Sequence, residues 1–308
     1  MSTQETLTLI AYMLAPAFFS LLGMAAIGSP AIAILGEISA KTRKKVFFDK
    51  YGQQTAAMGL ILTVSVILIC GASFGLAMVK FPKLFQAYFT PGSPFFQGMV
   101  AFGVFLVAGL LYFTTWEKLR SAKAAHIALG LVATFGAIIG LAIIIPAKLL
   151  FNLSLNGSTG DALTNTAILA QPMSAMYALL AISAAAALSM GYLILRRQKD
   201  DFGRDYYGFA LRMAARWALL PMIGFLGCQG WLYSRFPADI QTLILGTPLA
   251  FVWTALVSVG AICCFIWLFL SRSESPMRFK GLAILTLALF WVMHTLNVTL
   301  FVNFMTML

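Results

Sequence analysis

Charged side chains are scarce in this chain of 308 residues. Asp, Glu, Lys and Arg together make up 10% of it, whereas hydrophobic residues make up 61%. Soluble domains carry roughly 25% charged residues and about half apolar ones. No water-soluble core could bury this excess of apolar side chains, so the composition excludes a soluble protein and predicts an integral membrane protein.

Cysteine and histidine are also scarce. The chain has four cysteines and two histidines, and no two cysteines form a Cys-x-x-Cys motif. This excludes c-type haem attachment and a cysteine-rich zinc site, so no metal site is expected. We interpret the cysteines as small apolar residues of the spans, because all lie in apolar runs. They are Cys70, Cys228, Cys263 and Cys264.

Long apolar runs are what the sequence has in abundance. Eight runs reach or exceed the roughly 20 residues that cross the hydrocarbon core of a bilayer. Each must be helical, because lipid offers no hydrogen-bond partner to an open backbone. The predicted spans are Leu7–Leu35, Thr55–Val79, Phe95–Thr115, Ile127–Leu150, Met173–Leu195, Phe209–Trp231, Leu249–Leu270 and Leu282–Thr306.

The order of these runs predicts an all-α polytopic membrane protein whose eight helices form two four-helix bundles. Both halves of the chain cross the membrane in the same alternating order. Residues 1–152 would form the first bundle, and residues 173–308 the second. Residues 153–172 begin with the turn-forming segment Asn156–Gly160 and are expected to form a loop between the bundles.

The net charge of +11 is concentrated in the loops at one end of the predicted spans. In a soluble protein this charge would suggest nucleic acid, but Lys- and Arg-rich loops set the orientation of a membrane protein. We therefore expect no nucleic-acid partner and expect both termini outside the cytoplasm. The loop cations are Lys41, Arg43, Lys44, Lys45, Lys50, Lys118, Arg120, Lys123, Arg196, Arg197, Lys199, Arg204, Arg272, Arg278 and Lys280, and the opposite end carries Lys80, Lys83, Lys148 and Arg235.

An ordered set of short motifs follows the first half of the chain. Through these motifs, residues 11–152 resemble subunit I of the cytochrome bd quinol oxidases. The resemblance implies two four-helix bundles and a ninth helix, quinone and haem cofactors, and a bacterial cytoplasmic (inner) membrane location with periplasmic termini. The motifs are Leu35-Gly36-Glu37 at the end of the first span, Gly92-Ser93-Pro94 before the third, Tyr112-Phe113 and Trp116-Glu117-Lys118-Leu119 at its end, and His126 at the head of the fourth.

The chain departs from that family at the positions that carry its chemistry. A phenylalanine pair matches the haem-ligating histidine of the first helix, and the two glutamates of the third helix are replaced. The low-spin haem ligand would fall near a Met-Tyr pair, and the long quinol-binding loop is missing. An oxygen-reducing three-haem site is therefore not expected. The departures are Phe18-Phe19, Gln97, Phe105, Met176-Tyr177 and the short segment 237–248.

The two histidines, His126 and His294, lie at different depths in the predicted spans. His294 lies about twelve residues into the last span, which places it ~18 Å deep at 1.5 Å per residue. His126 lies at the head of its helix, so one haem iron shared by both is not expected. We interpret His126 as an interfacial hydrogen-bonding residue. For His294 two alternatives stay open: a haem b ligand, with a methionine opposite, or a neutral imidazole bonded to a neighbouring hydroxyl or carbonyl.

Other polar residues inside the spans are few. Arg212 and Arg216 share one face of the sixth span, and Arg216 lies at a depth compatible with Glu37. The sequence therefore predicts a Glu37–Arg216 pair, with snorkelling of the arginine to the surface as the alternative.

A polar, aromatic-flanked rim is predicted at the outer ends of the third and fourth spans. Gln97, Lys148, Tyr88 and Asp161 could bind a quinone head group there; the alternative is an ordinary aromatic belt.

Three functions follow from these observations. The first is a bd-like subunit of a multi-subunit respiratory complex, which binds quinone or anchors partners and does not itself reduce oxygen. Its partners would be other membrane subunits and a peripheral redox subunit, either a multihaem cytochrome c or an iron–sulfur protein. The second is a single-haem cytochrome b, and the third is a transporter. Small-residue faces at Gly23–Gly28 and Ala181–Ala187 are the expected contacts for a partner helix.

Overall fold

The computed structural model describes residues 2–155, 160–199 and 202–307. Within these ranges the chain is helical, with short connections. The elements are α1 (Thr3–Arg43), α2 (Val46–Lys80), α3 (Pro82–Tyr88), α4 (Pro94–Thr114), α5 (Lys123–Leu155), α6 (Gly160–Arg196), α7 (Gly203–Arg235), α8 (Ala238–Leu245), α9 (Leu249–Arg272), the 3₁₀ helix η1 (Pro276–Phe279) and α10 (Lys280–Met307).

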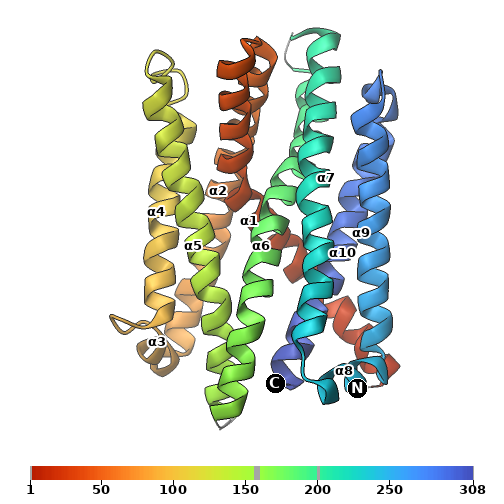
Figure 1. Ribbon diagram of the computed structural model, residues 1–308. Coiled ribbons are helices and arrows are strands. Elements are labelled where there is room, and N and C mark those ends of the chain that lie inside the picture. The colour runs from red at the N-terminus through yellow and green to blue at the C-terminus, as the bar shows by residue number, and fades with distance from the viewer. Residues whose placement is uncertain (1, 156–159, 200–201, 308) are drawn as a thin grey trace.

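The predicted eight spans are confirmed, because eight helices are long and apolar enough to cross a membrane. They run side by side, as Figure 1 shows, and the short helices α3 and α8 lie at the end that carries both termini. We call this the terminal end. The opposite end, where α1 joins α2, α4 joins α5, α6 joins α7 and α9 joins α10, is called the basic end.

The loop predicted at residues 153–172 is wrong over most of its length. α5 continues to Leu155, and α6 begins at Gly160 and contains Pro172. The turn-forming residues are confined to 156–160, and the residues that follow include alanines and leucines, which favour helix.

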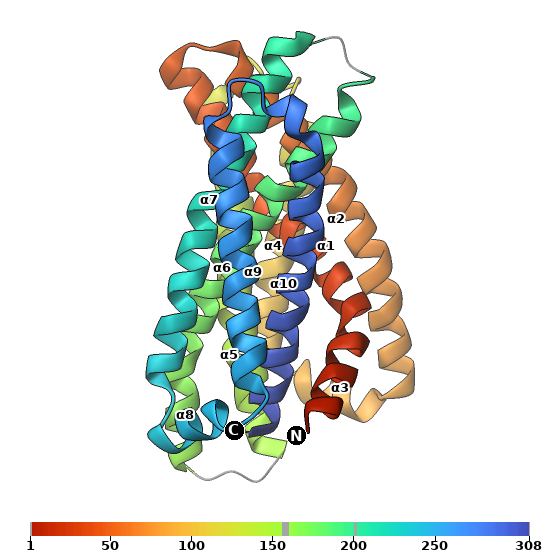
Figure 2. The same cartoon turned by 90° about the vertical axis from the view of Figure 1, so that its right-hand side faces the viewer.

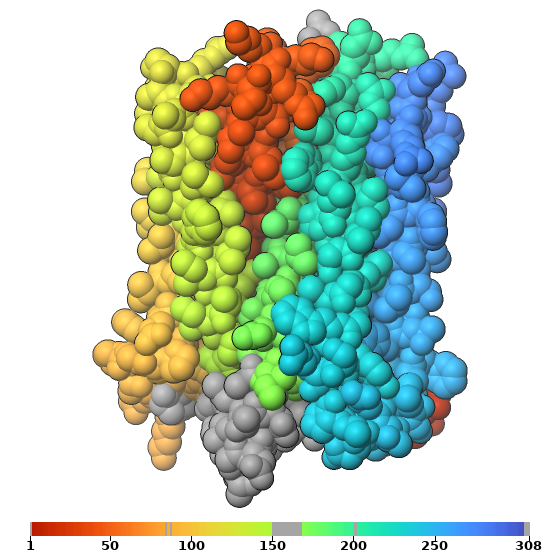
Figure 3. All heavy atoms as spheres, in the orientation of Figure 1, coloured from red at the N-terminus to blue at the C-terminus, as the bar shows by residue number. Residues whose placement is uncertain are grey.

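The eight long helices form two groups: the first is α1, α2, α4 and α5, and the second is α6, α7, α9 and α10. The helix α1 connects the two groups. It packs against α2 and α5 of the first group and against α6 and α10 of the second. A Cβ atom at Gly28 would overlap the backbone carbonyl of Ala181 in α6, so only glycine permits this approach. Small residues allow such close backbone packing in membranes. Figure 3 shows α6 recessed between α5 and α7.

The small-residue face of α6 is used inside the chain. Ala181, Ala184, Ala185 and Ala187 are all buried, with exposed fractions of 2% or less. This face is therefore not available to a partner subunit. Of the two small-residue faces that were expected to contact a partner helix, the one at Ala181–Ala187 is used within the chain.

Two apolar segments contact little of their own chain. Residues 7–16 of α1 and residues 64–80 of α2 include no buried residue. Figure 2 shows the first turns of α1 and the later turns of α2 along one edge of the molecule. Space is also open beside Gly23, where an added Cβ would meet no atom within 4 Å. Lipid or a partner helix must cover these surfaces in a bilayer.

Candidate functional site

A buried charged cluster lies near the basic end of α1. The Glu37 side chain is 0% exposed, and its carboxylate accepts from Lys123 Nζ at 3.1 Å. The same ammonium lies 2.6 Å from Asp49 Oδ1, at the start of α2. The hydroxyl of Tyr112 donates to Glu37 Oε2 at 3.3 Å. Two helices besides α1 thus supply the partners of one buried carboxylate, and Lys123 links it to Asp49 of α2.

His126 completes this cluster. Its Nδ1 lies 2.9 Å from Glu37 Oε2, and its Nε2 lies 3.0 Å from the backbone oxygen of Tyr112. Its ring stacks on the Tyr112 ring at 4.4 Å between centroids and meets the Trp116 ring edge-on at 4.9 Å. His126 thus hydrogen-bonds to a side chain of α1 and to the backbone of α4. A carboxylate and a carbonyl only accept hydrogen bonds, so both ring nitrogens of His126 face an acceptor.

The cluster brings two acidic and two basic side chains together. Glu37 and Asp49 supply the carboxylates, Lys123 supplies an ammonium, and His126 supplies an imidazole. A buried ion is tolerated when it is paired and hydrogen-bonded, as each of these is. The cluster is suited to locking α1, α2, α4 and α5 together at the basic end of the first group.

The predicted Glu37–Arg216 pair is wrong. Arg216 is exposed, and its Nη2 donates to the backbone oxygen of Ser271 at 3.4 Å. Arg212 likewise donates to the backbone oxygens of Ser273 and Glu274. Arg212 and Arg216 therefore bind the end of α9 and the residues that follow it, whereas α4 and α5 provide the partners of Glu37. Similar depth in the membrane does not show that two residues lie on neighbouring helices.

His294 lies inside the second group of helices and is 0% exposed. Its Nε2 lies 3.1 Å from Ser20 Oγ of α1, and its Nδ1 has no hydrogen-bond partner among the described residues. A side chain with no accessible surface has no water-sized space beside it. The residues around His294, and around His126 at 1% exposed, therefore do not leave room for a haem macrocycle.

Hydrogen-bonded side chains fill the place where the family resemblance puts the low-spin haem ligand. Gln229 Nε2 donates to Met176 Sδ at 2.9 Å and to Asn297 Oδ1 at 3.4 Å. Asn297 Nδ2 lies 3.5 Å from the Tyr177 hydroxyl. These residues of α6, α7 and α10 satisfy one another within the core.

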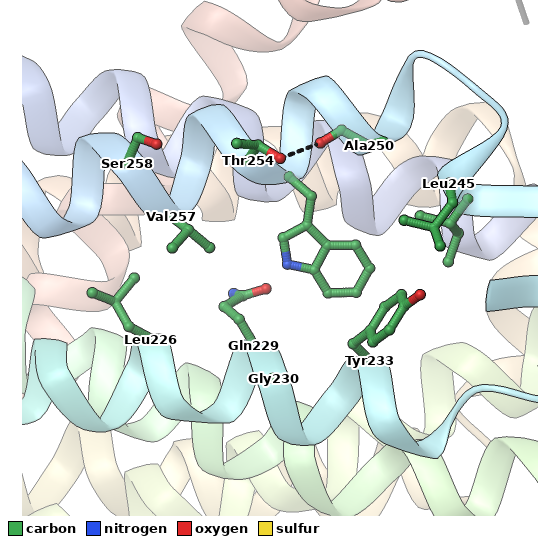
Figure 4. A pocket seen from close by; sticks show the side chains of 11 residues that line it. Leu226, Gln229, Gly230, Tyr233, Leu245, Ala250, Thr254, Val257 and Ser258 are labelled. Carbon is green, nitrogen blue, oxygen red and sulfur yellow. Dashed lines mark hydrogen bonds between the residues drawn. The ribbon is translucent and has the colours of Figure 1, made fainter. Parts of the chain in front are cut away.

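A groove of about 470 Å³ opens beside Gln229, between α7 and α9 and next to α8. Figure 4 shows Gln229 and Tyr233 of α7 facing Thr254 and Val257 of α9 across it. The Trp253 ring is 8% exposed and meets the Tyr233 ring edge-on at 5.6 Å. The full lining is Leu226, Gln229, Gly230, Tyr233, Ile244, Leu245, Ala250, Trp253, Thr254, Val257 and Ser258.

Several polar groups of the groove are free to bind a ligand. The indole N–H of Trp253 and the hydroxyls of Tyr233 and Ser258 make no hydrogen bond to any residue that the structure describes. An apolar cavity with a few converging polar groups is the usual form of a small-molecule site. The lining includes no carboxylate and no histidine, so the groove is suited to binding and not to proton transfer.

Three of the four residues of the predicted quinone rim contact different partners in the structure. Gln97 donates to the backbone oxygen of Gly92, and the Lys148 ammonium lies 5.1 Å from the Phe301 ring centroid. The Tyr88 ring meets Phe95, and partial burial raises the pKa of its phenol. The side chain of Asp161 lies outside the described residues. The rim stays a prediction.

The sequence matches no protein-family model and no curated protein. The structure does match a solved one, the structure of bd oxidase from Geobacillus thermodenitrificans. The TM-score is 0.67 and the sequence identity 12%, over 96% of this chain and 86% of that chain. The chain has a bd-like fold. At this identity the likeness describes the arrangement of helices alone, so the chemistry has to come from this chain's own residues.

Phenylalanines stand at positions that the sequence comparison matched to the family's cofactor ligands, and their surroundings differ. Phe18 and Phe19 are 43% and 49% exposed, and Phe18 meets Trp291 edge-on. Phe105 is 3% exposed on α4 and packs near Gly136 of α5. Sequence analysis missed Gln229, Tyr233 and Trp253, although an amide within an apolar run was a signal that could have identified the site.

Proposed function

We propose that this chain is a bd-like integral membrane subunit of a multi-subunit respiratory electron-transfer complex, and that the α7–α9 groove binds quinone. The observation that carries the proposal is the set of free donors in an apolar groove beside α8. In the family that the sequence resembles, the quinol-binding loop joins the corresponding two helices. A quinone ring offers two carbonyl oxygens, which the Trp253 N–H and the Tyr233 hydroxyl could bind.

Quinone binding alone moves no electrons. Oxidation of a quinol releases two electrons and two protons, and both histidines of this chain are enclosed by protein. We therefore place the redox centre in a partner, either a multihaem cytochrome c or an iron–sulfur protein at the terminal end. A second membrane subunit would cover the exposed segments of α1 and α2. A single-haem cytochrome b is the weaker candidate, because His294 has no space beside it.

A photoreactive quinone tests the site. The purified protein is illuminated with an azido-quinone in nanodiscs, and the labelled peptides are identified by mass spectrometry. We expect labels on α7 and α9, suppressed by excess unlabelled quinone. Competed labels on α4 and α5 instead would favour the rim of Gln97 and Lys148. Unsuppressed labelling spread over all lipid-facing helices would contradict quinone binding.

Purification in mild detergent tests the complex. We expect the chain to migrate with other subunits on native gels and those subunits to carry haem or iron–sulfur clusters. A lone monomer that retains quinone-linked electron transfer would contradict the partner proposal.

A further inference from the structure

A second cavity lies at the basic end, and the quinone proposal does not use it. It has a volume of about 610 Å³ and is bounded by the start of α2, the end of α6, the start of α7 and the segment between α9 and η1. We call it the arginine pocket. Its charged lining residues are Arg197, Arg204, Asp205, Arg212, Glu274 and Arg278.

The charge of the arginine pocket is unbalanced. Among the residues that the structure describes, four arginines line it, against the two carboxylates of Asp205 and Glu274. The side chains of Arg197, Arg204 and Arg278 make no ion pair or hydrogen bond with any residue that the structure describes. The N-terminal end of the α7 helix dipole also points its positive pole toward the pocket, where Asp205 is the acidic residue of the first turn. The pocket therefore favours an anion.

The fourth arginine helps to shape the pocket. Arg212 is half-buried, and its Nη1 donates to the backbone oxygens of Ser273 and Glu274 at 3.3 and 2.9 Å. These bonds fix the segment that carries Arg278. The other three guanidinium groups keep all their donors for a ligand, and guanidinium matches the oxygens of a phosphate in pairs.

The remaining wall is apolar and rigid. Phe47 of α2 meets Phe209 of α7 at 5.7 Å between ring centroids, and Pro276 and Met277 also line the pocket. Phe47 is 40% exposed. The pocket thus joins a basic surface to an apolar one at the end of membrane-spanning helices, where the headgroup and glycerol of a phospholipid lie.

We propose that the arginine pocket is a binding site for the phosphate-bearing headgroup of an anionic phospholipid. The paired guanidinium groups bind the phosphate oxygens, and the aromatic wall contacts the glycerol and the first acyl carbons. Free phosphate shares the recognising chemistry but has no use for the apolar wall. The site differs from the general attraction of basic loops to anionic membranes, because arginines from three separate segments converge on one cavity.

Native mass spectrometry of the full-length protein in mild detergent tests the proposal. The probes are phosphatidylglycerol and cardiolipin, with phosphatidylcholine as the uncharged comparison. The pocket variant is Arg204→Gln with Arg278→Gln, which removes no side-chain bond to a described residue. The matched control is Lys118→Gln with Arg120→Gln, which removes the same charge from an exposed loop at the same end.

We expect the wild-type protein and the control to retain an anionic lipid, and the pocket variant to bind it about tenfold more weakly or worse, because two charge-assisted contacts are lost. The proposed site would be wrong if both variants bound the anionic lipid equally weakly. It would also be wrong if the wild-type protein retained phosphatidylcholine as well as it retains the anionic lipids. Inorganic phosphate is added in a parallel series. Displacement of the lipid by low-millimolar phosphate would overturn the lipid assignment, and so would an acidic polypeptide that co-purifies and blocks lipid binding.

Discussion

Oε2 of Glu37 on α1 lies 2.9 Å from Nδ1 of His126 on α5, and both residues are buried. The pair joins the end of one span to the head of another, and Lys123 bridges Glu37 to Asp49. Removal of one partner from such a cluster leaves the buried Glu37 carboxylate with fewer compensating contacts, which costs far more than the loss of an exposed pair.

The substitution His126→Ala is expected to destabilise the fold by about 3–5 kcal/mol, the usual cost of breaking a buried ion pair. The midpoint of unfolding in a denaturing-detergent titration measures this loss. The control is Tyr112→Phe, which removes only the 3.3 Å bond to Glu37 and should cost about 1 kcal/mol. Equal effects of both variants would contradict the role of His126 as the main partner of Glu37.

A comparison of two glycines in α1 tests the contact between the helical groups. We expect Gly28→Ala to lower stability by about 1–3 kcal/mol, because the new methyl group meets the carbonyl of Ala181. Gly23→Ala should be neutral or stabilise by up to about 1 kcal/mol, since that position has open space within a helix. Thermal unfolding midpoints in one detergent compare the two. The packing would be refuted if Gly28→Ala were as well tolerated as Gly23→Ala.

The spans could be predicted from the sequence because length and apolarity alone decide them. The side-to-side neighbours could not. Arg216 and His126 are both at a depth compatible with Glu37, and only the packing of α1 on α5 selects His126. Residues 160–172 were misjudged for a related reason, since the turn signal at Asn156–Gly160 was extended to a segment that continues as helix.

The candidate site shows the same limit. Gln229 and Trp253 lie in different spans, and no motif connects them. Their proximity depends on the packing of α7 against α9, which the apolar pattern of either helix does not encode. His294 was recognised as buried and polar, but its partner Ser20 comes from the other end of the chain.

The orientation of the protein in the membrane can be tested by labelling single cysteines from outside intact cells. With a membrane-impermeant maleimide we expect Lys83→Cys at the terminal end to react and Thr42→Cys at the basic end to react only after permeabilisation. The distribution of lysine and arginine between the two ends is the reason. The reverse pattern would invert the predicted topology.

His294 provides a test of haem binding. Because the imidazole is enclosed and contacts Ser20, we expect His294→Gln to leave the visible absorption spectrum of the isolated chain unchanged. Ser20→Ala is the matched control, since it removes the same contact and leaves the histidine. Loss of a Soret band in His294→Gln but not in Ser20→Ala would identify a haem ligand and restore the single-haem cytochrome.

The quinone groove predicts an ordered set of affinities. Trp253→Phe and Tyr233→Phe each remove one free donor and keep an aromatic side chain, so each should weaken quinone binding by roughly threefold to tenfold, which corresponds to about 0.5–1.5 kcal/mol for a hydrogen bond. Trp231→Phe is the control, because Trp231 lies on the same helix outside the groove. Quinone titration in nanodiscs measures the dissociation constants. The groove is the wrong site if all three variants bind as the wild type does while Lys148→Met weakens binding, and that result would favour the rim at the terminal end of α4 and α5.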